Sequence, residues 1–149
     1  MGDLNQGEFG QPEIGVGRAL KVSVSLPEDV VAEVRAFLSA RVAACAAAGI
    51  GPGRVLIDPG FGFGKTLEHN LTLLRRLAEL ICTDAALLVG LSRKALLGTL
   101  IGRPATERSA GSVALAVLAA QSGARIIRAH DVAATVDALK VVAAVTGGG

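Results

Sequence analysis

The chain has 149 residues, which fits a single domain, and 51% of them are hydrophobic, which is enough for a core. Its formal net charge of +2 excludes the strongly basic surface that nucleic-acid binding requires. No apolar run is long enough to cross a bilayer and no amino-terminal segment resembles a signal peptide, so we expect a cytoplasmic protein with no membrane partner. Cys45 and Cys82 lie within helical patterns and are expected to be reduced core thiols.

The first 25 residues are predicted to form an irregular lead, because glycine recurs there without a helical or strand period. Only Ala19–Ser25 alternates loosely and could form one weak strand. The segment Ser25-Leu26-Pro27-Glu28 matches a capping box and predicts a helix that ends near Ala48. Apolar residues recur every three or four positions along it and are expected to face the core: Val31, Val34, Leu38, Val42 and Cys45.

Strands and helices then alternate to the end of the chain. Strands are predicted at 54–58, 86–91 and 124–128, and helices from residue 67, at 94–100, at 106–121 and from residue 132. Thr66 and Asp131 are expected to cap the helices that follow them, and His69 to be structural. The helix after Thr66 should bury Leu67, Leu71, Leu74, Ala78 and Ile81, with Leu73, Leu77 and Leu80 widening the stripe, and the last helix should bury Val132, Val136, Leu139 and Val142. The long connections between strands predict a parallel α/β sheet.

The segment from Ile57 to Thr66 is the most informative, because a buried strand leads directly into an acid and a glycine-rich loop. It is not a phosphate-binding P-loop, because that motif needs a glycine where Pro59 stands, and its glycine spacing is not the dinucleotide fingerprint. A turn that only relieved strain would not require Asp58 or two phenylalanines. An acid at the carboxyl end of a parallel strand is typical of a ligand site.

Charged side chains follow all three predicted strands, and the carboxyl ends of parallel strands share one face. Asp58 either accepts hydrogen bonds from a ligand or braces the glycine loop, and Lys94 either donates to a ligand or is a solvated lysine. Strand alternation would place Arg128 and His130 on one side, where together they suit an oxyanion such as pyrophosphate. A structural histidine is the alternative for His130.

Three blocks of sequence resemble the signature of the dihydropteroate synthase family. They are Asp58–Lys65, Val89–Lys94 and Arg128–Asp131, and they occur in the family's order and spacing. The resemblance extends from about Asp29 to Val145. The family's fold is a (β/α)8 barrel of the TIM type, so the resemblance implies that residues 26–149 form a partial pterin-binding barrel, about strands six to eight with flanking helices.

The family joins hydroxymethyl-dihydropterin diphosphate to para-aminobenzoate and releases pyrophosphate, as a transferase of folate biosynthesis. The resemblance implies that Asp58, Lys94, Gly62 and Phe63 bind the pterin and that Arg128 and His130 bind the diphosphate. It further implies that Phe63, Lys94 and Ala95 line the aminobenzoate site. The family usually has serine where Ala95 stands.

The resemblance also implies Mg²⁺ as a cofactor, but the family's metal-ligating asparagine has no counterpart among these residues, so no metal ligand is assigned. Two functions stay open at this point. The chain could be a synthase that assembles its site with a second copy or a complementary half. Alternatively, it could be a non-catalytic pterin-binding or structural remnant.

Overall fold

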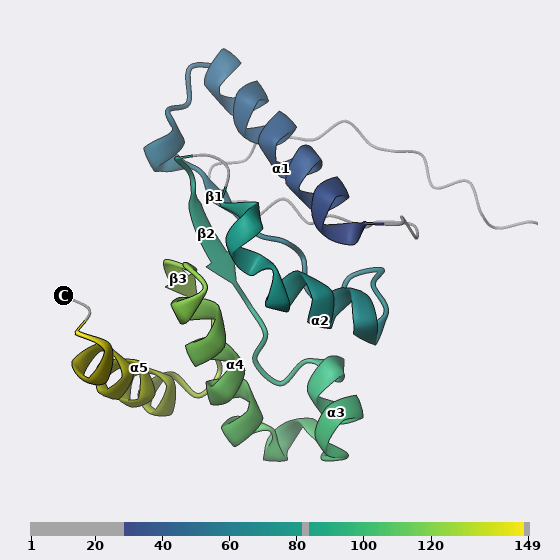
Figure 1. The fold of residues 1–149 in the computed structure, drawn as a ribbon, viewed down its shortest axis with the longest axis vertical. Helices are drawn as coiled ribbons and strands as arrows, with labels where there is room; N and C mark the ends of the chain where they lie inside the picture. The colour runs from purple at the N-terminus through teal and green to yellow at the C-terminus, as the bar shows by residue number, and fades with distance from the viewer. Residues whose placement is uncertain (1–28, 82–83, 148–149) are drawn as a thin grey trace, which may run out of the picture.

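The computed structural model describes residues 29–81 and 84–147. The predicted lead at 1–25, its weak strand and Cys82 lie outside these residues. The described part is an α/β fold whose strands β1 (Leu56–Ile57), β2 (Ala86–Val89) and β3 (Ile126–Ile127) pair in the order β1-β2-β3 (Figure 1). Both pairings are parallel, which confirms the predicted sheet.

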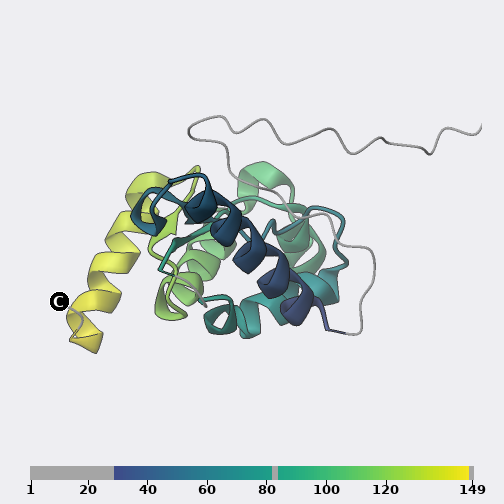
Figure 2. The same ribbon diagram turned by 90° about the horizontal axis from the view of Figure 1, so that it is seen from above.

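Helices connect and flank these strands. They are α1 (Val30–Ala47), η1 (Pro52–Arg54), α2 (Leu67–Arg75), η2 (Leu77–Leu80), α3 (Ala95–Ile101), η3 (Ala105–Glu107), α4 (Ser109–Gln121) and α5 (Val132–Thr146). Helix α1 packs against α2 and η2, and α4 packs against α5 and β3. The view from above shows α1 crossing over the sheet while α5 lies at the margin of the molecule (Figure 2). Among residues 29–81 and 84–147, no helix is long and apolar enough to span a membrane.

Helix α1 buries most of the predicted stripe, and the predicted capping box at 25–28 lies outside the described residues. Its N-cap is Asp29, whose Oδ1 accepts hydrogen bonds from the amides of Val31 and Ala32 at 3.0 and 3.2 Å. An N-cap carboxylate satisfies amides that have no partner within the helix. The buried side chains are Val30, Val31, Val34, Leu38 and Val42, whereas Cys45 is only half-buried.

Asp29 gives the fold a pH-dependent contact. Its carboxylate also pairs with Arg76, 3.0 Å away, and the amide of Ala32 and the Arg76 guanidinium lower the pKa of Asp29. A lowered pKa in the folded state stabilises the fold above the ordinary value of 3.8, and this contribution is lost as the pH falls below it. We expect the urea midpoint to fall less between pH 6 and pH 3 in Asp29→Asn, which still caps, than in the unmodified chain. Equal falls would contradict this role.

Helix α2 begins with the predicted cap. Thr66 Oγ1 accepts the amide hydrogen of His69, and His69 Nδ1 accepts that of Thr66, so both residues are structural as expected. The predicted buried stripe, however, is rotated. The fully buried side chains are Leu73, Leu77 and Leu80, while Ala78 and Ile81 are exposed. The chain leaves the α-helix at Arg76 and continues as the 3-10 turn η2, which changes the periodicity and turns different residues inward.

The sheet is shorter than predicted and covered mainly on one face. Ile57, Leu87 and Val89 are buried towards the helices, whereas Leu56 and Ile126 on the two outer strands are 45% and 38% exposed. A continuously apolar run such as β2 is typical of a parallel strand covered on both sides, but Ala86 and Leu88 are only half-buried. They lie on the same face as Leu56 and Ile126, which is the less covered face of the sheet.

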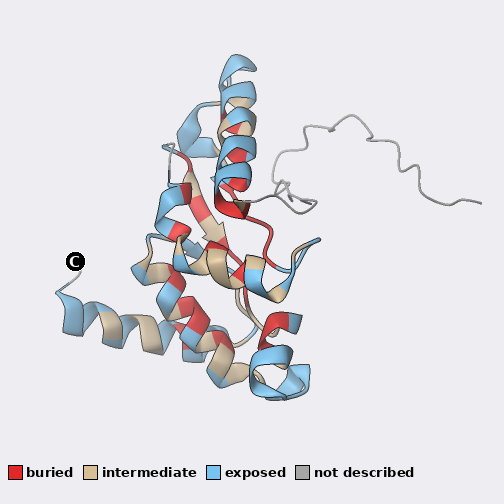
Figure 3. Cartoon of the chain, turned by 45° about the vertical axis from the view of Figure 1, so that its right-hand side comes forward, coloured by how far each residue is buried: buried red, intermediate tan, exposed pale blue. Residues whose placement is uncertain are grey.

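Helix α5 does not bury the predicted apolar stripe. Its only buried residue is Thr135, and Val132 and Val136 are 59% and 41% exposed. Leu139 and Val142 are half-buried. Most of the helix surface is open, in contrast to the buried side of α1 (Figure 3). The prediction was wrong because α5 packs mainly against α4, which covers only part of its surface.

Candidate functional site

The carboxyl ends of the three strands bring an acid and a base together. Asp58 directly follows β1, is 5% exposed, and accepts the Gly60 amide hydrogen at 2.8 Å. The second oxygen of Asp58 lies 3.8 Å from Nη2 of Arg128, which follows β3. Arg128 reaches across β2 at Gly90, where an added Cβ would lie 2.7 Å from Nη2. A side chain at position 90 would therefore require the Arg128 guanidinium to move.

The glycine loop after Asp58 has a strictly alternating backbone. Gly60, Gly62 and Gly64 have φ angles of 71°, 80° and 58°, a region that disfavours other residues. The alternation separates the two aromatic rings: Phe61 is fully buried, whereas Phe63 is 38% exposed. The loop thus fixes one ring in the core and leaves the other partly exposed at the surface.

Two side chains hold this loop from the α2 side. Asn70 is buried, and its Oδ1 accepts the Gly62 amide hydrogen at 2.8 Å while its Nδ2 donates to the carbonyl of Thr66 at 2.8 Å. Lys65 Nζ donates to the carbonyls of Gly60 and Phe63 at 2.9 and 3.2 Å. Burial lowers the pKa of Lys65, and the nearby Asp58 carboxylate opposes this effect. Sequence reasoning missed Asn70, although a polar residue on the buried side of an apolar helix was a signal for it.

Lys94 holds the loop from the opposite side. It is the N-cap residue of α3, and its Nζ donates a hydrogen bond to the carbonyl of Phe61. The same ammonium lies 4.9 Å from the centre of the Phe63 ring, within the range of a cation–π interaction. An added Cβ at Gly62 would lie 3.4 Å from Cδ of Lys94. Lys94, Gly62 and Phe63, which the sequence assigned to one site, are therefore in contact.

The loops after β2 and β3 are joined by polar contacts. His130 Nδ1 lies 2.9 Å from Ser92 Oγ, which also accepts the His130 amide hydrogen at 3.1 Å. Asp131 occupies the N-cap position of α5, but its side chain makes no capping hydrogen bond and instead pairs with Arg93 at 2.7 Å. The expected cap was wrong in this respect, because Arg93 competes for the carboxylate. This contact also lowers the pKa of Asp131. The sequence pattern did not predict a role for Ser92.

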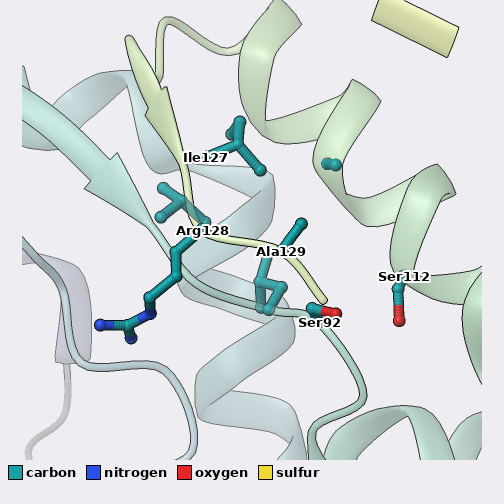
Figure 4. Close-up of a pocket in the computed structure, with 8 residues that line it drawn as sticks. Ser92, Ser112, Ile127, Arg128 and Ala129 are labelled. Carbon is teal, nitrogen blue, oxygen red and sulfur yellow. The ribbon is translucent and has the colours of Figure 1, made fainter. Parts of the chain in front are cut away.

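Strand alternation was expected to place Arg128 and His130 on one side, but these residues are not in a strand. Strand β3 ends at Ile127, so residues 128–131 are irregular chain without strand alternation. Arg128 contacts Asp58, and His130 contacts Ser92. The close-up shows the Arg128 side chain directed away from Ser112, and the small apolar pocket beside it lies between the strand ends and α4 (Figure 4). Ala95 is the first residue of α3 and is exposed.

The magnesium ion that the resemblance implies would need ligand side chains near the strand ends. Within residues 29–81 and 84–147, no three His, Cys, Asp or Glu side chains lie close enough to hold a metal ion. Asp58, the buried carboxylate of the site, is engaged by the Gly60 amide and faces a guanidinium. The described residues therefore hold no such ligand cluster, and Asp58 is the one buried carboxylate at these strand ends.

A sequence model described as "Pterin binding enzyme" matches residues 18–130. The chain belongs to the pterin-binding enzyme family. The match includes Asp58, Lys94 and Arg128, which are grouped around one loop, so the family resemblance seen in the three sequence blocks is confirmed.

Curated relatives carry the name expected from those blocks. Dihydropteroate synthase of Neisseria meningitidis serogroup C is 56% identical over 115 residues, which cover 76% of this chain and 41% of the relative. A protein of Mycobacterium bovis named "Inactive dihydropteroate synthase 2" is 42% identical over 118 residues, which cover 79% of this chain and 37% of that protein. The chain thus spans about two fifths of the length of these relatives.

Solved structures give the same result for the fold. Dihydropteroate synthase of Xanthomonas albilineans in complex with 7,8-dihydropteroate is 50% identical with a TM-score of 0.81, and the match covers 86% of this chain and 49% of that one. The enzyme of the same organism with 4-aminobenzoic acid is 53% identical with a TM-score of 0.79, covering 82% and 45%. The three parallel strands and five α-helices of the described residues therefore match part of the dihydropteroate synthase fold.

Proposed function

We propose that this chain supplies the pterin- and diphosphate-binding strand ends of a dihydropteroate synthase site. The observation that carries the proposal is the grouping of Asp58, Lys94 and Arg128 around one glycine loop. In this reaction, hydroxymethyl-dihydropterin diphosphate and para-aminobenzoate form a carbon–nitrogen bond and pyrophosphate leaves. The strand ends correspond to about strands six to eight of the family's barrel, with residues 26–149 as the partial domain.

Each proposed role follows from the chemistry of the side chain. The Asp58 carboxylate keeps acceptor capacity after its bond to Gly60, and it suits the adjacent amine and ring N–H of a pterin. Lys94 would turn its ammonium from the Phe61 carbonyl to the pterin ring carbonyl. Phe63 and Lys94, which lie in contact, would wall the aminobenzoate together with Ala95, the residue after Lys94.

The departing diphosphate needs positive charge and hydrogen-bond donors. Arg128 is 53% exposed at its side chain and carries the planar fork of donors that suits a diphosphate. His130, held through its Nδ1 side by Ser92, leaves Nε2 for the same ligand. Stabilising the charge that develops on the leaving group lowers the barrier to carbon–nitrogen bond formation. No step is assigned to Mg²⁺, because no cluster of three or more His, Cys, Asp or Glu side chains lies among the described residues.

The remaining groups of the site would come from a second polypeptide or from outside the described residues. The open sheet face with Leu56 and Ile126 supports such a partner, whether a second copy or a complementary half. The two Xanthomonas albilineans structures, one in complex with 7,8-dihydropteroate and one with 4-aminobenzoic acid, support these two ligand classes for this chain.

A non-catalytic pterin-binding protein is the second candidate. It is supported by the Mycobacterium bovis relative, which is named inactive although it is 42% identical over a similar span. In this case the strand-end groups would still bind a pterin, but no dihydropteroate would form.

Titration of the full chain by calorimetry separates the two candidates. The ligands are hydroxymethyl-dihydropterin diphosphate and then para-aminobenzoate with Mg²⁺, and dihydropteroate is measured by chromatography. Saturable binding with product supports the synthase, and binding without product supports the non-catalytic alternative. The exposed Lys140 on α5 provides a matched control, since Lys140→Ala should bind like the unmodified chain. Absence of saturable pterin binding would contradict both.

A further inference from the structure

Two side-chain bridges join the loop after β2 to the loop after β3. The first is the ion pair of Arg93 with Asp131, in which Nη2 lies 2.7 Å from Oδ1 and Nε lies 3.3 Å from Oδ2. The second is the contact of Ser92 with the ring and amide of His130. Each bridge spans 38 positions in the sequence, so local chain geometry does not create it.

Arg93 has an unusual backbone. Its φ angle of 58° is the only positive value among the non-glycine residues of the described chain. A non-glycine residue keeps this conformation only where surrounding contacts hold it in place. Its amide donates to Ser112 Oγ at 2.9 Å, and its carbonyl accepts from Arg108 Nη1 at 3.0 Å. Backbone and side chain of Arg93 are therefore fixed at the same time.

The same contacts fix the residue that follows. Arg108 Nη1 also donates to the carbonyl of Lys94 at 3.3 Å, and Lys94 is the N-cap residue of α3. Arg93 thus stands between the lysine proposed for the pterin and the loop that carries Arg128 and His130. The ion pair is partly shielded, with side-chain exposures of 31% for Arg93 and 21% for Asp131, so water screens it less than a surface pair.

We propose that Arg93 is a positioning residue that, through Asp131, sets the separation between the pterin subsite at Lys94 and the diphosphate subsite at His130 and Arg128. The inference rests on the proposed function, because it concerns the two subsites of that site. A ligand that carries both groups gains affinity when the two subsites stand at the spacing of its own bonds. Arg93 therefore acts on the joined ligand more than on either part alone.

The test compares three ligands: 6-hydroxymethylpterin, inorganic pyrophosphate, and hydroxymethyl-dihydropterin diphosphate, which joins the two groups. Calorimetry on the full chain gives the association constant of each ligand. The advantage of the joined ligand is its association constant divided by the product of the constants of the two separate ligands. We expect Arg93→Asp and Asp131→Arg each to reduce this advantage about tenfold. The exchanged pair, with both substitutions, should regain most of it, because it restores the ion pair and aspartate accepts a positive φ. Unchanged advantage in both single variants, or no recovery in the pair, would overturn the proposal.

A second measurement needs no ligand and separates this inference from the proposed function. Amide hydrogen exchange of residues 128–132 should be faster in each single variant and return towards the original rate in the exchanged pair. Arg75→Asp removes an exposed ion pair with Glu68 on α2 and should leave this exchange unchanged. If the unmodified chain bound neither pterin nor pyrophosphate, the proposed function would fail. Unaltered exchange in Arg93→Asp would show that the bridge positions nothing.

Discussion

Lys94→Ala is expected to weaken pterin binding by about 10- to 100-fold while leaving the circular dichroism spectrum unchanged. Hydrogen bonds to a charged group contribute about 1.5–3 kcal/mol, which corresponds to this range of affinity. The side chain is half-buried and lies over the Phe63 ring at 4.9 Å, so its removal takes away a ligand donor without opening the main core. Titration calorimetry with hydroxymethyl-dihydropterin diphosphate measures the effect.

Lys140→Ala is the matched control for this variant, because it removes the same side chain from an exposed position on α5. Its affinity should equal that of the unmodified chain. A Lys94→Ala protein that has lost its helical spectrum would show instead that the lysine serves mainly to hold the Phe61 carbonyl. Full affinity in a folded Lys94→Ala protein would remove Lys94 from the pterin site.

Phe61→Ala is expected to lower the free energy of unfolding by about 3–5 kcal/mol, the range for deleting a buried aromatic ring. Phe61 is fully buried beneath the glycine loop and belongs to the hydrophobic core with Leu73, Leu77 and Leu87. The measurement is urea denaturation followed by far-ultraviolet circular dichroism, since the chain has no Trp or Tyr for fluorescence.

Phe63→Ala is the control, because the two rings lie two positions apart in the same loop and Phe63 is 38% exposed. Loss of the Phe63 ring should lower the free energy of unfolding by less than about 1 kcal/mol, as expected for a partly exposed residue outside the core. Equal losses for the two variants would mean that the alternating glycine backbone does not separate a core ring from a ligand-facing ring.

The order of elements could be predicted because local patterns determine it. The stripe of α1 repeats every three or four residues, and the glycines and Thr66 mark where helices begin and end. The buried faces of α2 and α5 could not be predicted in the same way. Leucines lie on more than one side of α2, so its buried side depends on the change to η2. In the described residues the valines of α5 stay largely exposed, because α5 packs mainly against α4. Burial depends on tertiary contacts that periodicity does not contain.

The site was predictable to the extent that it lies within the three sequence blocks. Asp58, Lys94 and Arg128 follow consecutive parallel strands, and this alone brings them to one face. Asn70, Ser92 and the pairing of Arg93 with Asp131 were missed. Their partners are backbone amides and side chains up to 38 positions away, and such contacts appear only when the loops are placed in space.

The open valines of α5 have a consequence for how the protein behaves in solution. Val132, Val136, Val141 and Val145 are between 41% and 81% exposed. Contacts through such aliphatic groups are driven mainly by the entropy of released water near room temperature, so they weaken on cooling. Sulfate, which is excluded from protein surfaces, strengthens them. Light scattering of this chain should therefore rise with ammonium sulfate and fall in the cold.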